Sequence, residues 1–283
     1  MYKIGVIERI HAKGLELLDK NKKFNYEIIE DISKENLKKE LPKFDGLTLR
    51  VAKLGPEILK ECKKLKVISR HGVGYDNVDI RYLKENNIKL LITATANAVS
   101  VAEHVMYMIL SLSKGIVQYD TMVRNGQFRN DTNKLLTFEL LNKEILIMGF
   151  GRIGKILIKR CLGFDMKVNV YDPFVVKQSV EECGGHKVED LDQSLKTADY
   201  ISIHMPLNEK TKNLINLDKL KTMKKNVIII NTARGGIINE NDLNIAVKNN
   251  IIFGAGLDVF EKEPPEINNP LLNNEKVFLS PHT

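Results

Sequence analysis

The fold of this 283-residue chain is decided by the stretch KEILIMGFGRIGKILIKRCLGFDMKVNVYD, residues 143–172. The apolar run Ile145–Met148 has the length and β-branched content of a buried parallel strand. A G-x-G-x-x-G turn follows at Gly149–Gly154, then a helical pattern, then a second strand that ends on Asp172. This order of strand, glycine turn, helix, strand and acid predicts a dinucleotide-binding unit.

Each glycine of the turn has a separate physical role. Gly149 permits the tight turn, Gly151 lets a pyrophosphate approach the backbone, and Gly154 lets the helix pack closely on the strand. The free N–H groups at the helix N-terminus, which include those of Arg152 and Ile153, are expected to face the phosphates. The turn is therefore the predicted phosphate site.

Asp172 predicts which dinucleotide binds. It stands about 20 residues beyond the first glycine, where an acidic side chain accepts hydrogen bonds from the adenosine ribose. A carboxylate there repels a 2′-phosphate, and Pro173 and Phe174 offer no cation to receive one. We expect NAD as the cofactor, not NADP.

Composition excludes several classes of protein. With 43% hydrophobic and 28% charged residues, the chain can bury a full core, and no apolar run approaches the roughly 20 residues of a membrane span. The net charge of +7 comes from lysines dispersed among glutamates, which favours a solvated surface over nucleic-acid binding. Three scattered cysteines and histidines without metal-ligand spacing indicate a reducing cytoplasm and no metal site.

The first hundred residues alternate short apolar strands with charged helices, which predicts a complete α/β domain with a parallel sheet. The expected strands are Ile4–Ile7, Tyr26–Ile29, Leu47–Leu49, Val67–Ser69 and Leu90–Thr93. The expected helices are His11–Lys20, Lys34–Leu41, Pro56–Cys62 and Val78–Asn86.

The pattern changes near Asn97. Ser100 and Glu103 have capping-box spacing, and apolar residues then repeat at helical intervals. We expect one long helix that runs to Arg124 and bridges two domains, residues 1–97 and 98–283. A loop at Gln127–Leu136 is expected to follow.

After Asp172 the alternation of strands and helices resumes. Together with the strand at Ile145 and the strand that ends on Asp172, it predicts six strands of a doubly wound nucleotide-binding sheet. The later strands are Tyr200–Met205, Val227–Thr232, Phe253–Val259 and Val277–Leu279, and the helices are Leu191–Thr197, Leu217–Met223 and Glu240–Asn249.

Ligands of such sheets sit beyond the carboxyl ends of the strands. Those positions hold, in addition to the glycine turn, His204, Met205, Pro206, Thr232, Ala233, Arg234, Asp258 and His282. His204 is interpreted as lining the cofactor pocket. All eight are expected to lie at the cofactor.

Three side chains suit catalysis: Arg234, His282 and one of two glutamates. Arg234, between an apolar run and two glycines, suits a bidentate grip on a carboxylate, although a surface ion pair is the plainer alternative. His282 ends an apolar strand and is suited to exchange a proton near neutral pH. Glu261 and Glu263 are both candidates for its carboxylate neighbour, and the residues alone leave this choice open.

These motifs together resemble the D-isomer-specific 2-hydroxyacid dehydrogenases over almost the entire chain. The matching segments are RHGVGYDNVD at Arg70–Asp79, NAVSVAEH at Asn97–His104, GFGRIG at Gly149–Gly154, INTARGG at Ile230–Gly236, GLDVFEKEPP at Gly256–Pro265 and SPH at Ser280–His282. The resemblance implies a flavodoxin-like substrate domain followed by a Rossmann nucleotide domain, with a cleft between them.

The resemblance also implies residue roles. Arg234 would bind substrate, His282 would be the acid/base, and Glu263, which immediately precedes the proline pair, would be its partner. Family members are commonly homodimers through the helix after Asn97. In the family the chain continues past this histidine and returns to the first domain, so that return segment is expected beyond residue 283.

Basic residues at the strand ends of the first domain concern the substrate. Arg50, Lys53 and Arg70, the last beside Gly72, Val73 and Gly74, exceed what one carboxylate needs. The surplus indicates a second anionic group such as a phosphate, unless the cations pair with Asp76 or Glu57.

The same segments are similar to those of phosphoglycerate dehydrogenases, so D-3-phosphoglycerate is the first expectation for the substrate. His71 is bulkier than the residue commonly found there. Hydroxypyruvate, glyoxylate or sulfolactate as substrate, or a non-enzymatic NAD(H)-sensing corepressor, are the alternatives.

Overall fold

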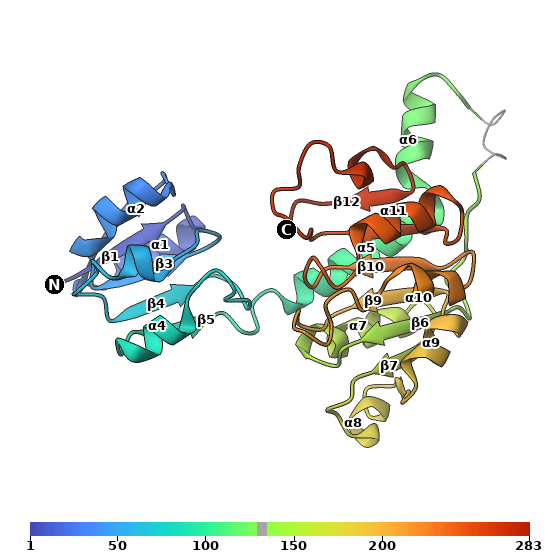
Figure 1. The fold of residues 1–283 in the computed structure, drawn as a ribbon, viewed down its shortest axis with the longest axis horizontal. Coiled ribbons are helices and arrows are strands. Elements are labelled where there is room, and N and C mark those ends of the chain that lie inside the picture. Colours follow the sequence, from blue (N-terminus) through green and yellow to red (C-terminus); the bar gives the residue numbers. More distant parts are fainter. Residues whose placement is uncertain (129–134) are drawn as a thin grey trace. The chain divides into compact units, whose positions relative to one another are not determined.

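The computed structural model of the protein describes residues 1–128 and 135–283, and the chain divides into two compact units, Met1–Asn97 and Ala98–Thr283 (Figure 1). Each unit contains one sheet made only of parallel strands. The α/β class predicted from the alternating pattern is confirmed. The loop expected at 127–136 lies for the most part outside the described residues.

The first unit has the strand order β2-β1-β3-β4-β5, which is the flavodoxin-like order. Its strands are β1 (Tyr2–Ile7), β2 (Phe24–Ile29), β3 (Gly46–Leu49), β4 (Val67–Arg70) and β5 (Lys89–Ile92). Its helices are α1 (Ala12–Asp19), α2 (Lys34–Glu40), the 3₁₀ turn η1 (Leu41–Lys43), α3 (Pro56–Leu59) and α4 (Ile80–Glu85). The order reverses between β1 and β3, so their carboxyl ends flank the place where such sheets bind ligands.

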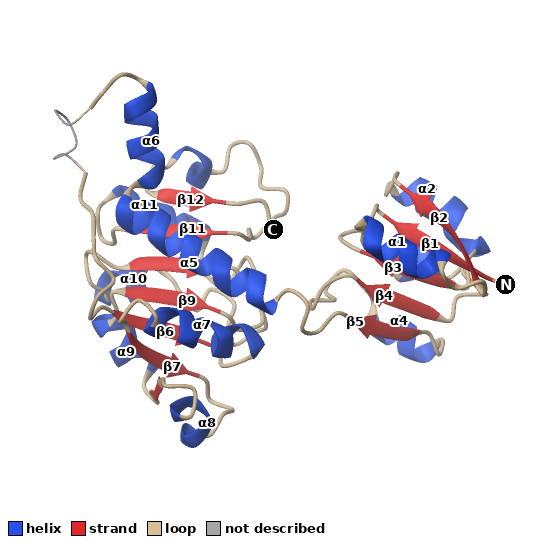
Figure 2. Ribbon diagram, turned by 180° about the vertical axis from the view of Figure 1, so that it is seen from behind, coloured by secondary structure: helices blue, strands red, loops and turns tan. Residues whose placement is uncertain are grey.

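The second unit has the strand order β12-β11-β10-β9-β6-β7-β8 (Figure 2). Counted from β6, this is the doubly wound nucleotide-binding order with one strand added. Its strands are β6 (Glu144–Met148), β7 (Lys167–Tyr171), β8 (His186–Lys187), β9 (Tyr200–Ile203), β10 (Ile228–Asn231), β11 (Gly254–Leu257) and β12 (Val277–Leu279). Its helices are α5 (Ala98–Lys114), α6 (Ile116–Arg124), α7 (Arg152–Leu162), α8 (Lys177–Glu181), α9 (Leu191–Thr197), α10 (Leu217–Thr222), α11 (Glu240–Lys248) and the 3₁₀ turn η3 (Pro270–Asn273).

Two predictions about the helix after Asn97 were wrong. Gly115 adopts φ 60°, which an L side chain rarely takes, and it divides the expected single helix into α5 and α6. Helix α5 already begins at Ala98, so Ser100 lies inside the helix and does not cap it. Glu103 instead accepts a hydrogen bond from Arg160 of α7 at 2.8 Å.

The core of the second unit lies on both faces of its sheet. Val105, Met108 and Ile109 of α5 are fully buried, and α5 packs against α7 and against β10 and β11. A fully buried aliphatic side chain contributes about 1.5–3 kcal/mol relative to an exposed one. This packing holds α5 rigidly beside the strand ends that carry the site.

Candidate active site

The glycine turn has the geometry of a phosphate cradle. Gly149 has φ 107°, and a Cβ on it would lie 2.7 Å from the carbonyl oxygen of His204; a Cβ on Gly154 would lie 2.3 Å from that of Gly149. Gly151 has no atom within 4 Å of its Cβ position, and no side chain caps α7. The open position and the uncapped N–H groups of Arg152 and Ile153 therefore fit a pyrophosphate.

Asp172 connects this turn to the end of β7. Its two carboxylate oxygens accept backbone N–H groups, Oδ2 from Phe150 at 2.8 Å and Oδ1 from Phe174 at 2.9 Å. A carboxylate has about four lone-pair sites, so both oxygens retain capacity for ribose hydroxyls.

A second feature that fits a dinucleotide lies at the end of β10. The buried hydroxyl of Thr232 has no hydrogen-bond partner within residues 1–128 and 135–283. An unsatisfied buried hydroxyl is costly, and a bound polar ligand would satisfy it. Ala233, next along the chain, is also partly exposed.

His204 is anchored at the end of β9 and has a neutral imidazole. Its backbone N–H donates to the Met148 carbonyl at 2.7 Å, and its Nε2 lies 2.8 Å from the hydroxyl of Ser202. Burial lowers the pKa of His204 to about 4, so it carries no proton to exchange near pH 7. Met205, which is partly exposed, and Pro206, which is exposed, follow it at the same strand end.

The loop that carries Arg234 is tightly built. Asn231 accepts a hydrogen bond from the Ala233 N–H at 3.0 Å and donates one to the Arg234 carbonyl at 2.9 Å. A Cβ on Gly235 would lie 1.9 Å from the carbonyl oxygen of Phe260. Only glycine permits this approach, which seats the Arg234 loop against the loop that follows β11.

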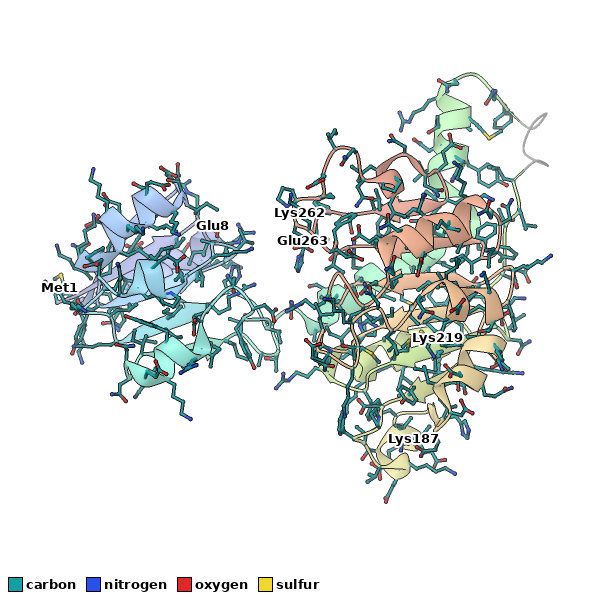
Figure 3. The ribbon with its side chains drawn as sticks, in the orientation of Figure 1. Met1, Glu8, Lys187, Lys219, Lys262 and Glu263 are labelled. Atoms are coloured by element: carbon teal, nitrogen blue, oxygen red, sulfur yellow. The ribbon has the colours of Figure 1, made fainter. Side chains whose placement is uncertain are left out.

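Glu263, rather than Glu261, faces His282. Nδ1 of His282 lies 2.7 Å from Oε2 of Glu263, whose Oε1 accepts the Phe260 N–H at 3.1 Å. Oε1 of Glu261 instead accepts the N–H of Glu240 at 3.1 Å. Figure 3 labels Glu263 on the loop that follows β11. The structure therefore settles which of the two glutamates meets the histidine.

Asp258 and His104 form a second group next to His282. Asp258, 3% exposed, accepts hydrogen bonds from the Ser280 hydroxyl at 2.5 Å and the Thr283 N–H at 3.0 Å. Nε2 of His104, on α5, lies 2.8 Å from the Ser280 hydroxyl. The sequence did not predict this contact, because Ser280 lies 176 residues further along the chain.

In the first unit, an acid that sequence reasoning missed holds the loop after β3. Oε2 of Glu8 accepts the N–H groups of Val51 at 2.7 Å and Ala52 at 3.2 Å, and Figure 3 labels Glu8 at the end of β1. The Asn77 amide donates to the carbonyls of Arg50 at 3.2 Å and Ala52 at 2.9 Å. The backbone that presents Arg50 and Lys53 is thus held from both sides, and both side chains are exposed. The signal that would have found Glu8 was its place directly after a strand.

Arg70 lies against its own loop. Its Nη1 donates to the His71 carbonyl, and a Cβ on Gly72, which has φ 154°, would meet the guanidinium. Val73 and Gly74 continue this loop as partly exposed residues. The pKa of His71 is lowered, first by its partial burial and then by the positive charges of Arg50 and Arg70. Two cations therefore lie near this imidazole ring. Glu57, which the sequence offered as a possible partner for these cations, lies 3.5 Å from Lys34.

Among residues 1–128 and 135–283, no helix is both long and apolar enough to cross a bilayer. The same residues include no cluster of three or more histidine, cysteine or acidic side chains arranged to hold a metal ion.

Comparison with known proteins identifies the family. Residues 106–283 match the sequence model of the D-isomer specific 2-hydroxyacid dehydrogenase, NAD binding domain. The chain is 36% identical over 281 residues to the D-3-phosphoglycerate dehydrogenase of Archaeoglobus fulgidus, covering 99% of this chain and 53% of that protein. It is 38% identical over 284 residues to the hydroxypyruvate reductase of Thermotoga maritima, covering 99% and 90%.

Solved structures agree. The TT0316 protein of Thermus thermophilus matches with a TM-score of 0.89 and 28% identity, over 99% of this chain and 89% of that one.

The chain spans about half the length of the phosphoglycerate dehydrogenases from Archaeoglobus fulgidus and Methanocaldococcus jannaschii that it matches. NAD is the cofactor of the second unit, and the chain belongs to the D-isomer specific 2-hydroxyacid dehydrogenase family.

Proposed function

We propose that this protein is an NAD-dependent oxidoreductase that transfers a hydride between the nicotinamide and C2 of a D-2-hydroxy acid. The observation that carries the proposal is the 2.7 Å contact of His282 with Glu263, on loops beside the glycine-seated loop of Arg234. Bound NAD supplies or accepts the hydride. The protein must then hold the acid and move one proton.

Each residue of this group has one task. Arg234 binds the substrate carboxylate through its planar guanidinium and polarises the C2 oxygen. His282 accepts the proton of the C2 hydroxyl during oxidation and returns it during reduction. Glu263 orients the imidazole and stabilises its protonated form.

The substrate is proposed to carry a second anionic group, as D-3-phosphoglycerate does. Support comes from Arg50 and Lys53, both exposed on a loop held by Glu8 and Asn77, and from the nearby charge of Arg70. Relatives include D-3-phosphoglycerate dehydrogenases, a hydroxypyruvate reductase and a glyoxylate reductase. Hydroxypyruvate, glyoxylate or sulfolactate is the alternative.

We also propose a cytoplasmic homodimer that pairs through α5. Exposed Tyr107 on this helix borders an open groove of about 490 Å³ that is shared with α7 and whose lining includes exposed Phe164. Exposed apolar side chains at such a groove suit a second copy. The three cysteines of the protein are free thiols, which suits the reducing compartment proposed here.

The test is NADH oxidation with 3-phosphohydroxypyruvate, hydroxypyruvate, glyoxylate, pyruvate and sulfopyruvate. At least one 2-oxoacid should be reduced rapidly, and His282→Ala should lower kcat by at least ~10²-fold. NADH binding without turnover of any 2-oxoacid would refute the enzymatic proposal and favour a cofactor sensor.

A further inference from the structure

The backbone at His282 is unusual and is held from both sides. His282 has φ 59°, a left-handed conformation that is unfavourable for a non-glycine residue. Oδ1 of Asp258 accepts the Ser280 hydroxyl on one side of this residue and the Thr283 N–H on the other. Hydrogen bonds to a charged acceptor are stronger than those between neutral groups, so this pair offsets the strain.

The positions of the hydrogens between Asp258, Ser280 and His104 follow from which of their atoms can only accept a hydrogen bond. A carboxylate accepts only, so the Ser280 hydroxyl hydrogen points to Asp258 at 2.5 Å. The Ser280 oxygen must then accept from Nε2 of His104 at 2.8 Å, which means that Nε2 of His104 carries the hydrogen. Nε2 also lies 3.6 Å from Oδ1 of Asp258, so the carboxylate is close to this imidazole nitrogen.

His104 is well placed to fix this group. Its side chain is only 19% exposed, and it projects from α5, whose buried face is anchored in the core. Its ring lies 5.7 Å from that of Tyr107, which in turn meets Phe278 of β12 at 5.3 Å. The series of hydrogen bonds from α5 through Ser280 and Asp258 therefore ends on the N–H of Thr283, the residue after His282.

We infer that His104 is a positioning residue for His282 and acts through Ser280 and Asp258. This rests on the proposed function, which gives His282 the proton-transfer role. Removal of the His104 N–H leaves the Ser280 oxygen unsatisfied and frees the segment at 280–283 to shift. A displacement on the order of 1 Å at a reacting group reduces rate by as much as about 10²-fold.

The kinetic test compares two variants of His104. His104→Ala should lower kcat about tenfold or more while leaving the dissociation constant of NADH within about threefold, because the phosphate turn is untouched. His104→Gln, whose amide offers an N–H near the Nε2 position, should recover most of kcat. His186→Ala, on the exposed edge strand β8, is the matched control and should leave kcat unchanged.

The second test does not depend on turnover. Imidazole NMR should report His104 as the Nε2–H tautomer, and His104→Ala or Ser280→Ala should shift or broaden the His282 ring signals while His186→Ala does not. If His104 is the Nδ1–H tautomer, or if both variants leave the His282 signals and kcat unchanged, the inference is wrong. If the signals change but no 2-oxoacid is ever reduced, the proposed function fails and the positioning role stands.

Discussion

Nδ1 of His282 lies 2.7 Å from Oε2 of Glu263, although the two residues follow different strands. Because the carboxylate can only accept, Nδ1 carries a hydrogen, and Nε2 is the nitrogen that would exchange a proton in the proposed reaction. The second carboxylate oxygen is held by the Phe260 N–H, so Glu263 cannot rotate freely. This arrangement sets both the tautomer and the orientation of the imidazole.

Loss of the charge at Glu263 should therefore lower kcat. Glu263→Gln is expected to reduce it by about 10²-fold, because the amide stabilises protonated His282 less than the carboxylate does. Glu261→Gln is the matched control, because Glu261 accepts a hydrogen bond from the N–H of Glu240. This variant should keep kcat within about twofold. Steady-state NADH oxidation measures both, and equal losses in the two variants would contradict the assignment.

The glycine turn provides a pair of substitutions with opposite outcomes. Gly154→Ala places a Cβ 2.3 Å from a backbone oxygen and should destabilise the second unit by about 1–3 kcal/mol. Gly151→Ala enters open space, so the melting temperature should change little, but the methyl group should weaken NADH binding about tenfold or more. Thermal unfolding and NADH titration separate the two effects. Unweakened binding in Gly151→Ala would rule out the phosphate cradle.

Preference for NADH should depend on the charge of Asp172. Because this side chain also holds the N–H groups of Phe150 and Phe174, Asp172→Asn is a better probe than alanine, since it keeps an acceptor. The ratio of kcat/KM for NADH to that for NADPH should fall about tenfold. A native preference for NADPH would overturn the prediction.

Much of the fold was predictable from local pattern. β12 at Val277–Leu279 and α9 at Leu191–Thr197 have the bounds that periodicity predicted. β8 was missed because two residues show no periodicity. The break at Gly115 was missed because apolar spacing continues on both sides of it, and one residue with φ 60° changes the direction of the chain without changing the pattern.

The site was predictable only where position along a strand reveals it. Arg234 and His282 follow apolar strands, and this position together with their side-chain chemistry selected them. The choice of Glu263 over Glu261 depends on the position of Glu240, whose N–H donates to Glu261, and the sequence does not reveal that position. Glu8 and His104 contact groups 43 and 176 residues away, so their places after a strand and in a helix did not reveal which groups they hold.

The anion site proposed at Arg50 in the first unit should distinguish substrates by charge. Arg50→Ala should raise the Michaelis constant for 3-phosphohydroxypyruvate by about 10–10²-fold and that for pyruvate by less than about threefold. Glu8→Ala should act in the same direction, more weakly, because it releases the loop rather than removing the cation. Lys34→Ala, which removes a cation that pairs with Glu57, is the control. Equal effects on both substrates would exclude a second anion at Arg50.

His204 should make stability depend on pH. Its pKa is about 4 in the folded protein and about 6.5 when unfolded, so the unfolded chain binds the extra proton first as the pH falls. The contribution is fully present above about pH 6.5 and is lost progressively toward pH 4. Urea unfolding at pH 7 and pH 5 should show a decrease about 2 kcal/mol larger for the native protein than for His204→Gln. Equal decreases would contradict a partly buried, neutral His204.

The contact at Gly235 has a consequence for engineering. A backbone that approaches the Phe260 carbonyl this closely cannot move without displacing the loop that carries Glu263. Substitutions on the Arg234 loop and on the Glu263 loop should thus have non-additive energies, because each alters the frame in which the other acts. Attempts to transplant a new specificity would have to exchange the two loops as one cassette.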